Sequence, residues 1–293
     1  AAACGERLIP VTLELGGKAP AIVCDDANLD RTVNCLTWGG FGNSGQVCVS
    51  VERILVDKKI APELTRRLVE SINKLRQGDP TTTEVDVGAM TFPKQVDNVE
   101  RLVEDARSRG AKILTGGFRT DRHGQPAPAN VDSGKGRYYA PTLVGGVTHD
   151  MPIARQEIFG PAMPIIEVDG DEEAIRLAND SHLGLNAYVF TRSMKRARSI
   201  ANRVRAGSTV VNDVLGNFAM AELPFGGVKE SGLGRSHGVE GILSMCEERL
   251  VNHDRFPALK RDLWMYPYDR KLAKRAIQFL PRIAKILDAI GWT

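Results

Sequence analysis

The stretch GGFGNSGQVCVS, residues 39–50, decides between two kinds of fold. Gly40, Gly42 and Gly45 spell a literal G-x-G-x-x-G, the fingerprint of a dinucleotide-binding loop. That fingerprint requires a strand before the glycines and a helix after them, so that the pyrophosphate meets a helix N-terminus. Apolar periodicity predicts the inverse order here, with a helix over 29–40 and a β-like alternation after the loop. The pattern therefore disfavours a phosphate loop.

The same glycines precede Cys48, which indicates a nucleophile in place of a phosphate site. Small residues let a substrate approach the backbone closely, and we expect the chain to turn and put Cys48 at the start of a strand. Cysteine is the most nucleophilic at neutral pH of the side chains that form covalent intermediates. Its thiolate fraction depends on local positive potential and on nearby backbone N–H groups. A free cysteine more commonly fills a gap in a core, so the residues alone leave both roles open.

The rest of the chain alternates between strand-like and helix-like segments. The runs VTLEL (11–15), RILVD (53–57) and PAMPIIEV (161–168) predict strands, whereas 61–76 and 95–109 carry apolar stripes at helical spacing. Strands that alternate with helices imply an α/β fold, in which a mostly parallel sheet is flanked by helices.

The composition is that of an ordinary globular protein, with 42% apolar residues and a net charge of +3 over 293 residues. A net charge this close to neutral argues against a nucleic-acid partner. Five cysteines, an odd number without a C-x-x-C pair, indicate neither a disulfide scaffold nor a metal site. Free thiols fit a reducing compartment, and the sequence shows neither a signal-peptide pattern nor an apolar run of bilayer length. We therefore expect a soluble, cytoplasmic protein without a metal.

The segment 255–293 differs in character, because it carries nine Lys and Arg residues against three Asp and Glu. Its spacing predicts an amphipathic helix with one apolar and one basic face. The apolar positions are Leu272, Ile277, Leu280, Ile283, Leu287 and Ile290, and the basic ones are Lys271, Lys274, Arg275, Arg282 and Lys285. Such a helix commonly packs on its own protein or on a partner subunit. The alternative is a peripheral contact with an anionic membrane surface.

Four motifs resemble those of one enzyme family, the aldehyde dehydrogenase superfamily. FGNSGQVC (41–48), with Arg53 five residues on, resembles the catalytic-cysteine motif, and LELGGKAP (13–20) resembles the glutamate motif that precedes it in the family. QEIFGP (156–161) and PFGGVKESGLGR (224–235) resemble two further family signatures. The motifs occur in the family's order over roughly the first 250 residues, so the resemblance implies an aldehyde dehydrogenase catalytic domain.

The resemblance implies a reaction in which Cys48 and Glu14 share the chemistry. Cys48 would attack an aldehyde carbonyl, hydride would pass to NAD or NADP, and a thioester would remain on Cys48. Glu14 would activate the water that hydrolyses this thioester. A carboxylate suits that role where partial burial raises its pKa toward neutrality.

The cofactor site is also implied by the resemblance. Glu157 in QEIFGP corresponds to the acid that binds the ribose hydroxyls on the nicotinamide side, which a carboxylate can accept. Phe159 would help to seat the ribose and the nicotinamide, and Leu15 is assigned to the same site. Val47 and Val49 flank the nucleophile and favour an aliphatic or aromatic aldehyde as substrate.

The resemblance also divides the chain. Residues 1–15 would be a remnant of the nucleotide-binding domain, 16–254 the catalytic domain, and 255–293 a basic tail with the amphipathic helix. In the family most of the nucleotide-binding domain precedes the glutamate motif, so we expect a truncated enzyme that assembles as a homo-oligomer. Two other functions stay open, namely a cofactor-free thiol esterase that uses Cys48 and Glu14, and a catalytically inactive fragment or assembly module.

Overall fold

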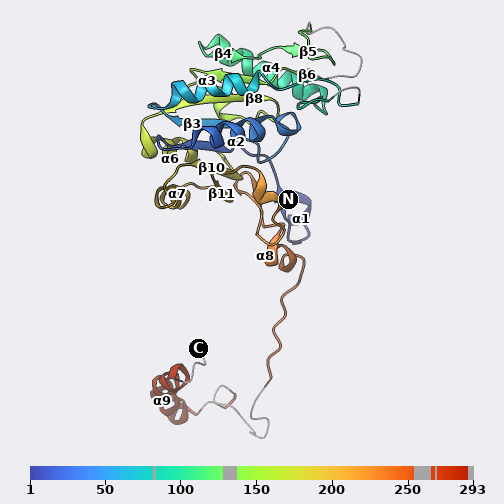
Figure 1. Cartoon of the computed structure of the whole chain (residues 1–293). Helices are drawn as coiled ribbons and strands as arrows, with labels where there is room; N and C mark the ends of the chain where they lie inside the picture. Colours follow the sequence, from blue (N-terminus) through green and yellow to red (C-terminus); the bar gives the residue numbers. More distant parts are fainter. Residues whose placement is uncertain (82–83, 128–136, 254–264, 268, 290–293) are drawn as a thin grey trace. The chain divides into compact units, whose positions relative to one another are not determined.

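The computed structural model describes residues 1–81, 84–127, 137–253, 265–267 and 269–289 (Figure 1). The chain divides into two compact units, residues 1–247 and 248–293, and each is described by itself. Unit 2 contains α9 (Arg270–Ala289), in the segment where the sequence predicts an amphipathic helix; Ile290 lies outside the described residues.

Unit 1 is built on a seven-stranded sheet in the order β11-β10-β2-β3-β8-β7-β4. The strands are β2 (Pro20–Val23), β3 (Arg53–Asp57), β4 (Lys112–Thr115), β7 (Thr142–Gly145), β8 (Ala162–Val168), β10 (Asn186–Phe190) and β11 (Ser208–Val211). All neighbours pair in parallel except β4 and β7, which are antiparallel. The predicted mostly parallel sheet is confirmed.

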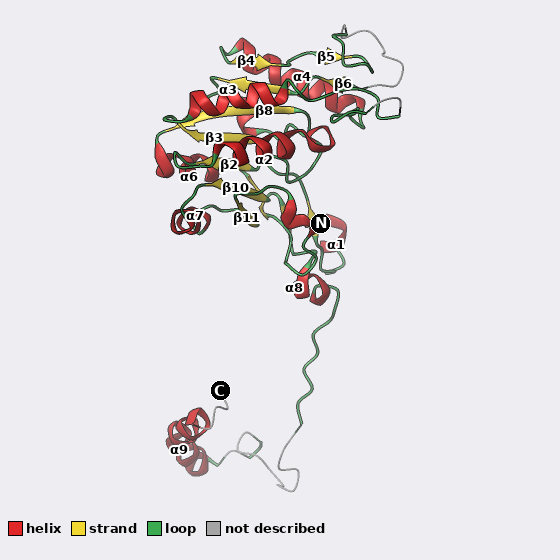
Figure 2. Ribbon diagram, in the orientation of Figure 1, coloured by secondary structure: helices red, strands yellow, loops and turns green. Residues whose placement is uncertain are grey.

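Helices cover both faces of this sheet (Figure 2). They are α2 (Leu29–Phe41), α3 (Ala61–Ile72), α4 (Pro93–Ser108), α5 (Pro152–Arg155), α6 (Gly170–Asn179) and α7 (Met194–Ala201). Buried residues of α2 and α3 belong to one apolar core cluster, and those of α4 to α7 belong to a second one. Successive residues of β3 alternate between the clusters, because Ile54 and Val56 join the first and Leu55 joins the second. A strand buried on both faces in this way needs a continuous apolar run such as ILV.

Short elements complete the unit. They are α1 (Ala2–Gly5), β1 (Leu13–Glu14), the 3-10 turns at Gly42–Gly45 and Gly216–Ala219, β5 (Arg119–Thr120), β6 (Tyr138–Tyr139), β9 (Leu183–Gly184), β12 (Val228–Lys229), β13 (Gly232–Leu233) and α8 (Gly238–Leu243).

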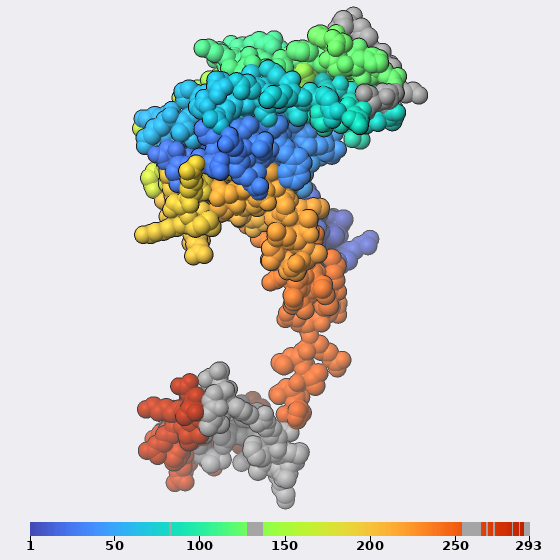
Figure 3. Space-filling model, viewed as in Figure 1, coloured from blue at the N-terminus to red at the C-terminus, as the bar shows by residue number. Residues whose placement is uncertain are grey.

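The predicted strand 11–15 is shorter and less buried than expected. Only Leu13 and Glu14 are in strand conformation, where they pair antiparallel with Leu233 and Gly232 outside the main sheet. The left-handed φ of Gly232 (149°) and of Gly234 (73°) turns the partner strand away after two residues. Figure 3 shows the N-terminal segment of unit 1, in blue, beside an orange segment of the same unit.

A buried ion pair ties the starts of two central strands to a distant loop. Lys18 Nζ lies 2.7 Å from Glu52 Oε2, and these side chains are 0% and 3% exposed. The same carboxylate accepts the backbone N–H groups of Ile158 at 3.0 Å and of Phe159 at 2.9 Å. Those N–H bonds and the ammonium partner together offset the cost of desolvating a carboxylate.

Arg53, the first residue of β3, adds a second buried positive charge. Its guanidinium donates to the carbonyls of Leu177 (3.1 Å) and Ala178 (3.0 Å) at the end of α6, and to the Lys18 carbonyl at 3.2 Å. A cation at the carbonyl end of a helix interacts favourably with the helix dipole. The side chain therefore fixes α6 to the sheet next to the ion pair.

We predict that Lys18→Met destabilises the protein severely, because it leaves the Glu52 carboxylate buried without its counter-charge. The expected loss is about 3–5 kcal/mol in the free energy of unfolding, measured by urea denaturation of the full chain. The double variant Lys18→Met/Glu52→Gln should recover part of it, since a neutral amide oxygen still accepts an N–H.

The matched control removes a charge from the exposed pair Arg203–Glu172. Arg203→Met should leave the denaturation midpoint unchanged within error, because exposed ion pairs contribute little to stability. A Lys18→Met variant that unfolds at the same urea concentration as the parent would refute the structural role of the pair.

Candidate active site

The turn before Cys48 is held in an unusual backbone conformation. Asn43, Ser44 and Gly45 all have left-handed φ values, of 51°, 58° and 71°. A β carbon at Gly45 would lie 2.2 Å from the Gly160 carbonyl oxygen, so only glycine allows this approach to the QEIFGP segment. A strained backbone conformation of this kind persists only where contacts with the surrounding structure hold it in place. The glycines of the opening motif therefore position the cysteine and do not form a phosphate loop followed by a helix.

Cys48 lies in a turn that ends before β3 begins at Arg53, which corrects the expectation that it starts a strand. The N–H of Ser50 bonds to the Val47 carbonyl at 2.8 Å and closes this turn. The turn forms because the Ser50 hydroxyl also bonds to the Gly39 carbonyl, at 2.9 Å, and pulls the segment back toward α2.

The surroundings of the half-buried Cys48 are apolar. Val49, Leu185 and Phe225 are almost fully buried and form a small cluster, against which Cys48 and Val47 pack. Burial raises the pKa of the Cys48 thiol, and the charge of Glu14 raises it further. The backbone N–H groups of Val49 and of Cys48 itself act in the opposite direction, because they stabilise the thiolate.

The glycine pair of the glutamate motif brings three candidate residues into one site. A β carbon at Gly17 would lie 2.5 Å from the Cys48 carbonyl oxygen, and one at Gly16 would lie 2.2 Å from Glu157 Oε2. The Gly17 N–H donates to Glu157 Oε1 at 2.8 Å. Glycine is required at position 17, where the neighbour is backbone, whereas a β carbon at position 16 would displace the Glu157 carboxylate, so the segment after Glu14 contacts both the Cys48 backbone and Glu157.

Glu14 is exposed and is held by the segment 224–236. Its Oε1 accepts a long hydrogen bond of 3.4 Å from the Ser236 hydroxyl, and a β carbon at Gly226 would come within 3.2 Å of the same oxygen. Partial burial raises the pKa of Glu14, while the Ser236 hydrogen bond and the charges of His237 and Arg235 lower it. The PFGGVKESGLGR motif, which sequence analysis left without a role, therefore supports this acid.

The loop of Glu157 and Phe159 is fixed by the ion pair of Lys18 and Glu52. Phe159 has a left-handed φ of 47°, which is uncommon for a bulky residue, and its N–H is bound by Glu52. Burial raises the pKa of the Glu157 carboxyl, and the Gly17 N–H lowers it. Sequence analysis missed both residues of the pair. The sequence did contain a signal for this ion pair, because a Lys and a Glu each stand at the edge of an apolar run that predicts a buried strand.

Leu15 is 47% exposed, and its N–H bonds to the Ser231 carbonyl at 3.1 Å. Its assignment to the cofactor site stays a prediction. Within the described ranges, no group of three or more His, Cys, Asp and Glu side chains is placed to hold a metal ion.

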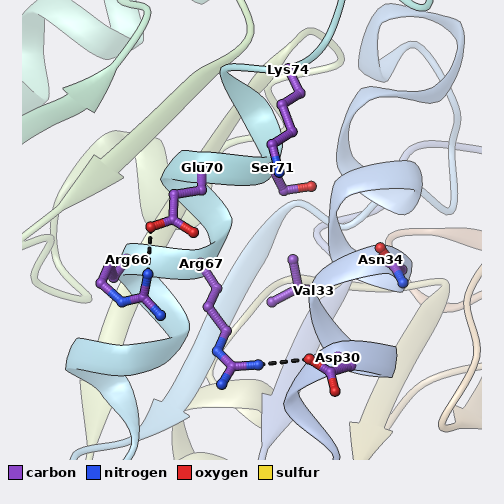
Figure 4. Close-up of a pocket in the computed structure, with 8 residues that line it drawn as sticks. All are labelled: Asp30, Val33, Asn34, Arg66, Arg67, Glu70, Ser71 and Lys74. Carbon is purple, nitrogen blue, oxygen red and sulfur yellow. Dashed lines mark hydrogen bonds and ion pairs between the residues drawn. The ribbon is translucent and has the colours of Figure 1, made fainter.

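Two surface pockets lie elsewhere on unit 1. One, of about 460 Å³, is lined mainly by α2 and α3, and two of its cations pair with lining acids, Arg66 with Glu70 and Arg67 with Asp30 (Figure 4). The other, of about 450 Å³, is lined by residues of β4, β8 and the end of β7, among them Lys112 and Glu167. Cys48 lines neither of these two pockets, so they do not bear on its chemistry.

Comparison with known proteins places most of the chain in one family. The model of the aldehyde dehydrogenase family matches residues 1–251. A 4,4'-diapolycopene aldehyde oxidase of Methylomonas sp is 41% identical over 263 residues, which are 89% of this chain and 46% of that protein. The chain spans about half the length of the curated relatives it matches, 46% and 48% of two of them.

Solved structures resemble the chain in fold as well as in sequence. A betaine aldehyde dehydrogenase of Staphylococcus aureus in complex with NAD+ superposes with a TM-score of 0.74 at 32% identity, over 82% of this chain and 45% of that one. The NAD+ complex of an aldehyde dehydrogenase from Bacillus cereus gives 0.75 at 34% identity, over 82% and 46%. With the family match over residues 1–251, the chain belongs to the aldehyde dehydrogenase family.

Proposed function

We propose that the protein oxidises an aldehyde to a carboxylic acid with NAD or NADP, using Cys48 as nucleophile and Glu14 as base. The observation that carries the proposal is the glycine pair Gly16–Gly17, which packs against Glu157 Oε2 on one side and the Cys48 carbonyl on the other. Family membership supports it, as do the related structures that hold NAD+.

The first step is carried by Cys48. Its thiolate attacks the aldehyde carbon, a C–S bond forms, and the carbonyl electron pair moves to the oxygen to give a thiohemiacetal. Because burial and Glu14 both raise the pKa of Cys48, the resting group is a thiol that must lose its proton first. We assign the acceptance of that proton to Glu14, whose charge raises the pKa of Cys48 more than that of Glu157 does.

The residues around Glu157 fit a nicotinamide cofactor. A carboxylate has about four acceptor positions, so the single N–H bond from Gly17 leaves capacity for the hydroxyls of a ribose. Phe159 follows two residues later, in a loop whose backbone Glu52 holds. The cofactor, when bound, supplies the acceptor for the hydride that leaves the carbon attached to Cys48, and that carbon becomes a thioester.

Glu14 completes the reaction by taking a proton from water. The hydroxide equivalent adds to the thioester carbon, the C–S bond breaks, and the carboxylic acid leaves as the Cys48 thiolate is restored. Glu14 acts as a base only when unprotonated, so hydrolysis should rise with pH through its raised pKa. Its exposure gives water direct access, which the half-buried Glu157 lacks.

Other features of the protein follow as part of this proposal. The apolar cluster of Val49, Leu185 and Phe225 favours aliphatic or aromatic aldehydes over charged ones. We retain the division into residues 1–15, 16–254 and 255–293, and we propose a cytoplasmic homo-oligomer on the basis of the family.

We predict that Cys48→Ser abolishes both NAD(P)H formation from an aldehyde panel and cleavage of an activated ester. Glu14→Gln should slow steady-state turnover by roughly 10²–10⁴-fold, because it removes the general base. Both are measured on the full chain by absorbance, with Cys246→Ser, at an exposed thiol, as the matched control.

The outcomes separate the three functions left open by the sequence. Ester cleavage that needs Cys48 but ignores NAD and NADP would favour a cofactor-free thiol esterase. Absence of both activities in a folded chain would contradict catalysis by this chain and favour an assembly module.

We further predict that Glu14→Gln makes Cys48 more reactive toward iodoacetamide. Loss of the carboxylate charge lowers the pKa of Cys48, so the pH profile of alkylation should shift to lower pH even as turnover falls. Mass spectrometry of the Cys48 peptide reports the rate, and the exposed Cys246 of the same chain is the internal reference. An unchanged profile at Cys48 would show that the two groups are not coupled.

A further inference from the structure

Helix α9 separates its charges and its apolar side chains completely. A helix advances about 100° per residue, so its basic positions fall within an arc of about 140°, while its Leu, Ile and Phe positions share the opposite half. The basic residues are Arg270, Lys271, Lys274, Arg275, Arg282 and Lys285, and all are exposed. On the apolar half Ile277, Phe279, Leu280 and Ile286 are 64%, 52%, 57% and 61% exposed; the side chains of Leu272, Ile283 and Leu287 are outside the described part.

The two long packed helices α3 and α4 have a different charge pattern, although the short packed helix α7 also carries only basic charges. The apolar stripes of α3 and α4 are buried in unit 1, and their polar faces mix both signs, with two Glu and two Arg in α3 and four acids and three bases in α4. These charges form ion pairs along the helix, such as Arg67–Glu63 and Arg109–Asp105 at the end of α4. α9 has six basic residues and a single acid, Asp288. A polar face whose charges are almost all positive is suited to bind a negatively charged surface.

We propose that α9 docks on an anionic phospholipid surface, with its axis in the plane of the membrane. Its apolar half would enter the boundary between headgroups and acyl chains, and its basic half would stay among the phosphates. Arg282 already lies 5.6 Å from the centroid of the Phe279 ring, at the border of the two halves. Long basic side chains at this border can keep their charge in water while their stems cover apolar surface.

The helix is suited to lie on a bilayer and not to cross it. Among the described segments, no helix combines the length and the apolar character that a membrane span requires. Six charged side chains along one face of α9 make burial in the hydrocarbon core costly. The inference is independent of the chemistry proposed at Cys48.

The test is flotation of the full chain with vesicles of phosphatidylcholine containing phosphatidylserine, and with phosphatidylcholine alone. We expect binding to the anionic vesicles that is at least tenfold tighter and that weakens with salt. Lys274→Gln/Lys285→Gln should weaken it by roughly 10- to 30-fold, as expected for two charges near the surface.

A matched pair of variants separates insertion from simple charge attraction. Leu280→Glu places a carboxylate on the apolar half, whereas Gln278→Glu makes the same change of charge on the basic half. Leu280→Glu should lose roughly 100-fold in affinity and Gln278→Glu only about fivefold. Equal losses would overturn the insertion of the apolar half.

Two further outcomes would overturn the proposal. One is binding that does not depend on phosphatidylserine, and the other is failure to bind either vesicle. If the apolar half is instead covered by protein, Leu280→Glu will change the oligomeric state or the thermal unfolding of a chain that does not float. Circular dichroism of each variant verifies that the helix content is retained.

Discussion

The buried ion pair of Lys18 and Glu52 is the interaction on which the site depends. It joins the residues just before β2 and β3, and it holds the N–H groups of Ile158 and Phe159. Each partner would be costly to bury alone, so the three segments are stable only when they assemble together. Because these segments contain or directly follow the glutamate motif, the cysteine motif and QEIFGP, a structural requirement brings the three motifs together.

Close backbone approach then sets the fine geometry. Gly16, Gly17 and Gly45 each stand where a β carbon would meet an atom at 2.2 to 2.5 Å. A close-packed interior cannot absorb such overlaps, so a larger residue would push the strand start away from Cys48 or from Glu157. At these positions glycine is needed because the neighbouring segments leave no space for a β carbon. At Gly45 it is also needed because the backbone has a left-handed φ. Within the G-x-G-x-x-G spacing, Gly45 is thus required by packing against Gly160 and not by a bound phosphate.

Local sequence pattern predicted the sheet and its helices well. A continuous apolar run such as ILV in β3 is stable only in a strand that is buried on both faces, so it identifies such a strand. Local pattern failed where contacts between residues distant in the sequence determine the structure. The strand at Leu13–Glu14 is short because of Gly232, and Cys48 precedes β3 because Ser50 bonds back to Gly39. The pairing of Lys18 with Glu52 likewise depends on β2 and β3 being neighbours, which no local pattern specifies.

The two acids near Cys48 differ in burial and in how they are held, which supports the different roles proposed for them. Glu157 is half-buried and bonded to the Gly17 N–H in a loop that Glu52 fixes, so its carboxylate is suited to hold a ligand in one orientation. Glu14 is exposed, on a two-residue strand, with only a long bond to Ser236. In the proposed reaction Glu14 takes a proton from the thiol and then from water, and it must exchange these protons with solvent, which a rigid buried acid would do slowly. The same Gly-Gly segment therefore lies between the exposed acid proposed as the base and the half-buried acid proposed to bind the cofactor.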